Sequence, residues 1–211
     1  MKLLGFFRDK EFSIETNVTR QEIIKKTRIA VIDDDEKLQL IDFLKKQGFS
    51  VDHDRKGNDL SKYSTGIYDV IIVDYHGVGS DLGNAQGLSL LRFLRKEAVG
   101  VRLIAYTSRS LTASEADFFK LSHAVLPKDW GVMDSMELIE EQVRITYSKS
   151  YLFDELVDGL GIKDSKTKKE LKNKLIECIE GGERDEFNKY LLKAFKFTAN
   201  KAIDVLIGKF F

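Results

Sequence analysis

Short apolar runs alternate with amphipathic stretches of helical length between residues 28 and 147. The apolar runs lie at residues 29–32, 68–73, 101–106 and 123–126, with a weaker run at residues 50–53. Runs this short, separated by stretches long enough for a helix, are typical of βαβ units around a parallel sheet. The pattern predicts a five-stranded α/β domain, which we place at residues 28–149.

The stretches between these runs carry apolar side chains three and four positions apart, on one face of a helix. Two such sets are Leu38, Ile41, Phe43 and Leu44, and Leu88, Leu91, Phe93 and Leu94. Gly48 and Gly100 follow the two sets, and we expect both to adopt the left-handed conformation that often ends a helix. The apolar faces of these helices would cover the sheet.

The rest of the chain, residues 150–211, contains no further β-rich run, and its pattern predicts helices separated by glycines. Its last segment, residues 183–208, predicts one continuous helix because it has no proline and no glycine before Gly208. One face of that helix would carry an apolar stripe of Phe187, Leu191, Phe195, Thr198, Ala202 and Leu206. We expect the stripe to pack in a homodimer or against Leu3, Leu4, Phe6 and Phe7 of an N-terminal extension, residues 1–27.

Composition and charge limit the classes of partner that we expect for this chain. The chain has 34 basic and 34 acidic residues, so its formal net charge is zero and it lacks the attraction of a basic domain for nucleic acid. A lysine-rich stretch at residues 163–174 is interrupted by acidic residues and indicates a solvated helix face. No stretch approaches the ~20 apolar residues of a membrane span. We expect a cytoplasmic protein with no nucleic-acid partner, with Cys178 and Trp130 in its core.

Polar residues follow the predicted strands at the ends where ligands bind. Asp33 and Asp34 follow the first strand, Asp74 the third, Thr107 the fourth and Lys128 the fifth. In an open parallel sheet these ends meet at one crevice. Neighbouring carboxylates repel each other unless a cation lies among them, and oxygen ligands suit Mg²⁺. The metal, the Lys128 ammonium and the Thr107 hydroxyl could neutralise charge on a phosphoryl group attacked by a carboxylate.

At these positions the chain resembles the receiver domains of two-component response regulators. The resemblance rests on four motifs in the family's order: Ile29-Ala-Val-Ile-Asp-Asp34, Ile71-Ile-Val-Asp74, Ile104-Ala-Tyr-Thr107 and Val125-Leu-Pro-Lys128. It implies a flavodoxin-like (βα)5 fold, a doubly wound parallel sheet of order 2-1-3-4-5, followed here by the α-helical C-terminal extension. It also implies phosphorelay signal transduction, with a sensor histidine kinase or a phosphotransfer protein as the partner.

The resemblance further implies a role for each site residue. Asp74 would be the phosphoacceptor and Asp34 a direct Mg²⁺ ligand. Asp33 would bind the metal through water, and the backbone carbonyl of His76 would complete the protein's ligands. Thr107 would be the switch hydroxyl and Lys128 the cation that pairs with the phosphoryl oxygens.

The chain departs from the family pattern in three places. The segment after the phosphoacceptor, residues 75–84, is long and rich in glycine, and we call it the glycine-rich loop. Pro127 precedes Lys128, whereas the family's proline follows its lysine. Val125 stands where the family has an aromatic switch residue. These departures leave the phosphoacceptor chemistry in place but alter the expected switching.

Two other interpretations stay open. A phosphatase of the haloacid dehalogenase type could use Asp33 and Asp35, with Thr107 and Lys128 in its later motifs, although that scheme gives Asp74 no role. A pseudo-receiver would instead act as a binding or dimerisation module. Transferable phosphate on Asp74 rather than Asp33 would separate the receiver from the phosphatase.

Overall fold

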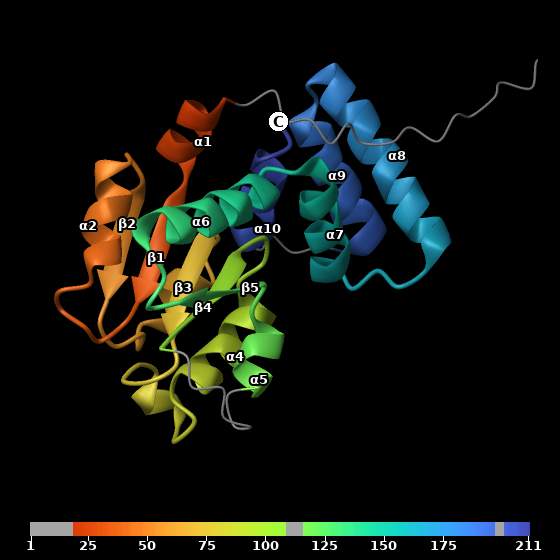
Figure 1. Cartoon of the computed structure of the whole chain (residues 1–211). Coiled ribbons are helices and arrows are strands. Elements are labelled where there is room, and N and C mark those ends of the chain that lie inside the picture. The colour runs from red at the N-terminus through yellow and green to blue at the C-terminus, as the bar shows by residue number, and fades with distance from the viewer. Residues whose placement is uncertain (1–18, 109–115, 197–200) are drawn as a thin grey trace, which may run out of the picture.

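A computed structural model describes residues 19–108, 116–196 and 201–211 of the chain (Figure 1). Its core is a sheet of five parallel strands in the order β2-β1-β3-β4-β5, as predicted. The strands are β1 (Arg28–Ile32), β2 (Ser50–Asp54), β3 (Val70–Asp74), β4 (Arg102–Thr107) and β5 (Ala124–Pro127). All five residues of β3 are buried because helices cover both faces of the sheet.

Helices cover each face because strand residues alternate between the two sides. Ile29 and Val31 face a core shared with α1, α2 and α6, whereas Ala30 and Ile32 face α3, α4 and α5. The first group is α1 (Arg20–Lys26), α2 (Gln39–Lys46) and α6 (Val132–Thr146). The second is α3 (Leu60–Tyr63), α4 (Gly87–Glu97) and α5 (Ala116–Leu121), and the short helix η1 (Ser80–Leu82) precedes α4. Helix α1 contributes Ile23 and Ile24 to the first core, although it lies in the predicted N-terminal extension.

The C-terminal region is helical, as predicted, and forms a third apolar core beside the sheet (Figure 1). Its helices are α7 (Lys149–Gly159), α8 (Ser165–Gly181), α9 (Arg184–Phe195) and α10 (Lys201–Gly208). Cys178 is buried in this core, as expected. No helix among the described residues has both the length and the apolar character to cross a membrane.

The prediction of one helix over residues 183–208 is wrong. Helix α9 ends at Phe195 because Lys196 adopts a left-handed conformation with a φ of 49°, and α10 begins at Lys201. Phe187, Leu191 and Leu206 of the stripe are all buried in the third core of the same chain. The stripe is therefore not free to pack in a homodimer, while Thr198 and the apolar residues 3–7 lie outside the described residues.

The C-terminal helices pack at the amino ends of the strands, away from the residues that follow β1 and β3. A Cβ on Gly66 would lie 3.2 Å from the Cα of Ala202, and a Cβ on Gly100 would lie 2.5 Å from Cδ1 of Leu206. Gly100 has a φ of 71°, as the sequence predicts, and its small size also lets α10 approach the start of β4. Gly48 likewise has a positive φ after α2.

Candidate functional site

The ends of β1 and β3 bring three carboxylates together. The two strands are neighbours, with Ile32 in register with Val73, so Asp33 and Asp74 leave the sheet side by side. Asp33, Asp34 and Asp74 each offer a carboxylate oxygen, and these oxygens lie within 4.8 Å of one another. Asp33 and Asp74 are buried, whereas Asp34 is exposed. The structure therefore assembles the predicted acidic cluster.

Lys128 follows β5 and forms ion pairs with both buried carboxylates. Its Nζ lies 2.8 Å from Oδ2 of Asp33 and 3.0 Å from Oδ2 of Asp74. Burial alone would lower the pKa of Lys128, but the two carboxylates outweigh burial and raise it. The Lys128 side chain is therefore a firmly held ammonium within the acidic cluster.

The Asp74 carboxyl group has a raised pKa. Burial is the largest cause, the Lys128 ammonium opposes it, and the nearby Asp33 carboxylate adds to the rise. The Oδ1 atom of Asp74 accepts a hydrogen bond of 2.8 Å from the backbone amide of Tyr75, which fixes the carboxylate's orientation. A second positive charge at this site would favour the ionised form of Asp74.

The buried oxygens fit a hard divalent cation. Oδ1 of Asp33 accepts a hydrogen bond of 2.9 Å from the amide of Asp35. Oδ2 is buried and, among the described residues, has the ion-pair contact with Lys128 but no directed hydrogen bond. A carboxylate oxygen left this way is suited to a metal or to metal-bound water. Asp33, Asp34 and Asp74 would hold Mg²⁺, and the ligand role of the His76 carbonyl stays a prediction.

Thr107 and Tyr106 border the cluster at the end of β4. Tyr106 is in register with Asp74, and Thr107, which is in register with Pro127, is buried. The Tyr106 ring lies under the Lys128 ammonium, with 5.0 Å between Nζ and the ring centroid. Thr107 is thus close in the fold to the residues that it was predicted to join.

Two of the departures from the family pattern are visible near β5. Val125 is 36% exposed, so the position of the expected aromatic switch points outward. Trp130 is 37% exposed, and the expectation that it belongs to the core is wrong because it lines an open groove with Lys128, Leu38 and Phe43. No cis peptide bond occurs among the described residues, including the one before Pro127.

The glycine-rich loop closes over Asp34. Gly77 has a φ of 72°, and a Cβ there would lie 2.2 Å from Oδ2 of Asp34, so only glycine fits. Its amide donates a hydrogen bond of 3.2 Å to Oε1 of Gln86 at the start of α4. Gly87 is equally constrained, since a Cβ there would lie 2.1 Å from the carbonyl oxygen of Asp74. Glycines thus let both the loop and α4 approach the acidic cluster.

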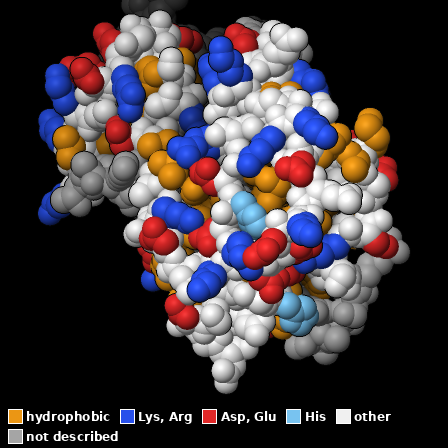
Figure 2. Space-filling model, turned by 90° about the vertical axis from the view of Figure 1, so that its left-hand side faces the viewer, with side chains coloured by type: hydrophobic (Ala, Val, Ile, Leu, Met, Phe, Trp, Pro, Cys, Tyr) orange, Lys and Arg blue, Asp and Glu red, His pale blue; other side chains and the backbone are white. Residues whose placement is uncertain are grey.

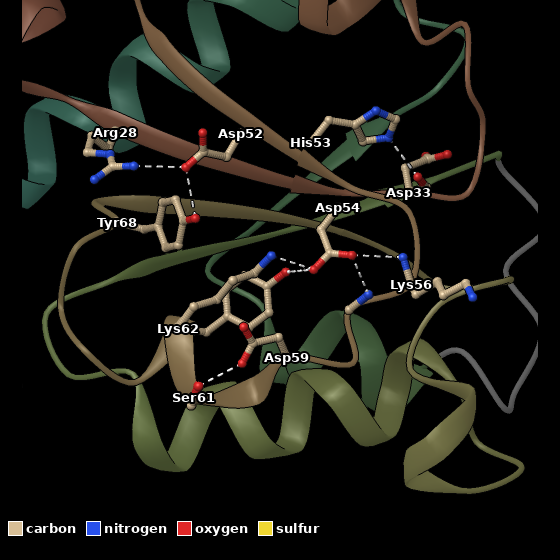
Figure 3. Close-up of polar contacts among 12 residues, drawn as sticks. Arg28, Asp33, Asp52, His53, Asp54, Lys56, Asp59, Ser61, Lys62 and Tyr68 are labelled. Carbon is tan, nitrogen blue, oxygen red and sulfur yellow. Dashed lines mark hydrogen bonds and ion pairs between the residues drawn. The ribbon is translucent and has the colours of Figure 1, made fainter.

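The polar network of strand β2 was not predicted (Figure 3). The carboxylate of Asp52 accepts hydrogen bonds from Arg28 and Tyr68, and Asp54 accepts them from Lys62 and Tyr63. His53 points the other way, and its Nε2 lies 2.8 Å from the carbonyl oxygen of Asp33. The signal in the sequence was two aspartates at strand spacing in Ser50–Asp54, a pattern unusual for a strand that a helix covers.

The surface on the side of β2 and α2 carries side chains of both charges (Figure 2). Acidic and basic side chains lie next to one another there, and neither sign forms a continuous field. The ion pair between Arg55 and Glu36 is one example, with both side chains more than half exposed.

The sequence matches no family model, and comparison with curated proteins finds no match. Solved structures do match. A CheY-like response regulator receiver domain protein from Methanospirillum hungatei JF-1 aligns with a TM-score of 0.50 and 19% identity, over 57% of this chain and 95% of its own.

A two-component system response regulator/GGDEF domain protein aligns with a TM-score of 0.52 and 16% identity, over 60% of this chain and 53% of its own. This chain therefore spans about half the length of that second protein. Identities this low establish shared architecture rather than shared activity. The matched part of the chain has the fold of response regulator receiver domains, and a helical region extends beyond it.

Proposed function

We propose that this protein is a phosphorelay receiver in which Asp74 accepts a phosphoryl group in a Mg²⁺-dependent reaction. The observation that supports this most is the position of Lys128, whose ammonium pairs with Asp74 at 3.0 Å and with Asp33 at 2.8 Å. A lone acidic pair at a strand end could be a solvated helix start. Where two buried carboxylates share one ammonium, that ammonium can also pair with the negative charge of an incoming phosphoryl group.

The proposed transfer needs one nucleophile and several charge-stabilising groups. An oxygen of Asp74 attacks the phosphorus, the new P–O bond forms, and the bond from phosphorus to the donor breaks. With a phosphohistidine donor, the electron pair of the broken P–N bond returns to the imidazole. Bound Mg²⁺ would neutralise charge on the transferred oxygens. Lys128 would exchange part of its pairing with the carboxylates for pairing with the phosphoryl group.

One further site residue, Thr107, would act on the product state. The Thr107 hydroxyl lies at the end of the neighbouring strand and would donate a hydrogen bond to a phosphoryl oxygen. The added group carries up to two negative charges, so an output requires two conformations that differ in how well they bind that charge. Val125 is exposed, and we therefore place the switch outside the aromatic position that the family uses.

The phosphatase alternative has less support in the fold. Asp35 is exposed, and its carboxylate accepts a hydrogen bond from the amide of Lys37, in the turn before α2, instead of joining the acidic cluster. In the described part of the chain no strand follows β5 to carry a further acidic pair. We expect a phosphoacceptor protein rather than an enzyme that acts on a separate substrate.

Several partners stay predictions. A sensor histidine kinase or a phosphotransfer protein is the expected phosphodonor. A homodimer would need residues other than the buried stripe, and among the described residues of the C-terminal region Leu192 and Phe211 are exposed large apolar side chains. The cytoplasmic location also stays a prediction.

The experiment that tests the proposal is intact-mass analysis after incubation with acetyl phosphate and Mg²⁺. We expect an adduct of about 80 Da, one phosphoryl group, on the wild-type protein and none on Asp74→Asn. Asp185→Asn, at an exposed position in the first turn of α9, is the matched control and should label like wild type. Labelling of Asp74→Asn at the wild-type level would overturn the proposal.

A further inference from the structure

The loop between β2 and α3, residues 55–59, is held by one partly buried carboxylate, that of Asp54 (Figure 3). Oδ1 of Asp54 accepts hydrogen bonds of 2.9 Å from the backbone amides of Lys56 and Gly57. Its Oδ2 accepts hydrogen bonds of 2.6 Å from Nζ of Lys62 and from the hydroxyl of Tyr63. With four donors, Asp54 fixes both the start of the β2–α3 loop and the helix that follows it.

The β2–α3 loop is also wedged between the sheet and α4. Gly57 has a φ of 67°, and a Cβ there would lie 2.8 Å from Cδ2 of Leu90 and 2.9 Å from Cγ2 of Ile32. Ile32 ends β1 and immediately precedes Asp33. At Gly57 the backbone of the β2–α3 loop therefore lies against the end of β1, which leads into the acidic cluster, and against the neighbouring helix α4.

Two hydrogen bonds join the β2–α3 loop to the glycine-rich loop. The amide of Gly79 donates to the carbonyl oxygen of Lys56 at 2.7 Å. The side-chain amide of Asn58 donates to Oδ2 of Asp81 at 2.6 Å. Only two residues before Gly79, Gly77 contacts the carboxylate of Asp34 with no room for a side chain. A chain of contacts thus runs from the β2–α3 loop to an exposed member of the acidic cluster.

From this arrangement we propose that the β2–α3 loop positions the glycine-rich loop over the acidic cluster, with Asn58 as a positioning residue that acts on Asp34 through Gly77. The proposal rests on the proposed function, since it assigns the Asp34 carboxylate to the binding of a divalent cation. The Asn58 side chain is exposed, and its hydrogen bond described above is to Asp81, which is not one of the three carboxylates of the acidic cluster. Its effect on cation binding would therefore be indirect.

The test compares Asn58→Ala with an exchange of the two partners. Asn58→Ala removes the donor without changing charge, so it releases the glycine-rich loop on one side. Asn58→Asp combined with Asp81→Asn keeps the net charge and rebuilds the hydrogen bond with donor and acceptor exchanged. Asn173→Ala, an exposed asparagine on helix α8, is the matched control.

Binding of Mn²⁺, followed by electron paramagnetic resonance, measures the cation affinity without any phosphoryl transfer. We expect Asn58→Ala to raise the Kd about tenfold, as groups that orient metal ligands generally do. The exchange pair and Asn173→Ala should stay within about twofold of wild type. At saturating Mg²⁺ the phosphorylated fraction of Asn58→Ala should match wild type, because the loop affects occupancy of the site and not the nucleophile.

An unchanged Kd in Asn58→Ala, or a Kd in the exchange pair as high as in Asn58→Ala, would overturn the positioning role. Wild-type protein that binds Mn²⁺ in this way but never accepts a phosphoryl group would instead contradict the proposed function alone. If Asn58→Ala lowered thermal stability without changing the Kd, the contact between the loops would serve folding only, and the proposal would fail.

Discussion

At the scale of single residues, Lys128 decides the electrostatics of the site. Its Nζ is within 3.0 Å of two buried carboxylates, and its own side chain is 26% exposed. Carboxylates in such a position are costly without a nearby positive charge. The stability of the folded state therefore depends on the Lys128 ammonium, which pairs with both buried carboxylates.

Replacement of Lys128 by methionine should destabilise the protein by about 1–3 kcal/mol, at the lower end for a broken buried pair because the lysine is partly exposed. Mg²⁺ should recover part of this loss because it binds the folded cluster. Urea titration with and without Mg²⁺ measures both effects. Lys96→Met, at an 82% exposed side chain, is the control and should change stability little. Equal losses in the two variants would contradict this view of Lys128.

His123 is a second residue whose charge state depends on the fold. Burial and the positive charges of Arg102 and Arg95 lower its pKa from 6.5 to about 3. Its Nδ1 accepts a hydrogen bond of 2.8 Å from the Leu103 amide, and its Nε2 contacts the Arg95 guanidinium. The same pocket is also lined by Lys96, Glu155 and Asp158. The folded protein thus holds this histidine neutral.

Acidification from about pH 6.5 to about pH 3 should destabilise the protein through His123, because the unfolded chain then binds a proton that the folded chain does not. The free energy of unfolding would fall by at most about 1.4 kcal/mol per pH unit from this group. His123→Asn keeps an acceptor for the Leu103 amide and removes the titration. Denaturant titrations across this range should give a flatter pH profile for His123→Asn, and parallel profiles would rule out the effect.

At the scale of elements, the glycine-rich loop differs from an ordinary turn because its glycines serve different purposes. Gly77 and Gly83 both have positive φ values, 72° and 112°. A Cβ on Gly77 would overlap the Asp34 carboxylate, whereas a Cβ on Gly83 would meet no atom within 4 Å. Backbone conformation alone explains Gly83, and the approach to Asp34 explains Gly77.

Gly77→Ala should weaken divalent-cation binding about tenfold or more because the methyl group displaces the Asp34 carboxylate. Gly83→Ala has a backbone cost of about 1–3 kcal/mol, because Gly83 has a φ of 112° and a ψ of −177°, but it should bind the cation like wild type. Calorimetric Mg²⁺ titration of both variants separates the two effects. If both variants lost affinity equally, general loop strain rather than contact with Asp34 would be responsible.

The strands and their polar ends could be predicted from sequence because they depend on local patterns. Apolar runs of strand length predicted all five strands, and the rule that parallel strands share one ligand-binding edge placed Asp33, Asp74 and Lys128 together. The break after Phe195 could not be predicted in this way, because Lys196 has no local feature that favours a left-handed conformation. Packing of α9 and α10 into one core overrides the helical pattern there.

The contacts around Asp54 and the exposure of Trp130 also lay beyond sequence reasoning. The four donors to Asp54 come from a loop and a helix whose positions are set by the whole fold. Trp130 follows β5, which is an edge strand of the sheet, and its side chain is 37% exposed. Composition predicts a buried tryptophan on average, but the edge of the sheet decides this particular one.

At the scale of the whole molecule, a buried ion pair ties the C-terminus to the sheet. The backbone amide of Asp69 donates a hydrogen bond to the carbonyl oxygen of Arg28, and its carbonyl oxygen accepts one from the amide of Arg102, at the amino ends of β1, β3 and β4. Its Oδ1 lies 2.6 Å from Nζ of Lys209, and the two side chains are 9% and 15% exposed. The C-terminal helices are therefore anchored where three strands begin, at the edge opposite the acidic cluster.

Lys209→Met should destabilise the protein by about 2–4 kcal/mol because it leaves the Asp69 carboxylate buried without its ammonium. Lys189→Met is the matched control, since Lys189 pairs with Glu186 at 2.7 Å but is 70% exposed. We expect that control to change stability by under about 0.5 kcal/mol. Thermal unfolding of the two variants measures the difference, and similar midpoints would show that the C-terminal anchor contributes little.

We propose that Asp74, held beside Asp33 by one shared lysine, is the residue that receives the phosphoryl group. Borohydride reduction converts an aspartyl phosphate to homoserine, so peptide mass mapping after acetyl phosphate and Mg²⁺ treatment identifies the acceptor directly. We expect homoserine at position 74 alone. Homoserine at position 33, or at neither position after treatment with the cognate kinase, would contradict it.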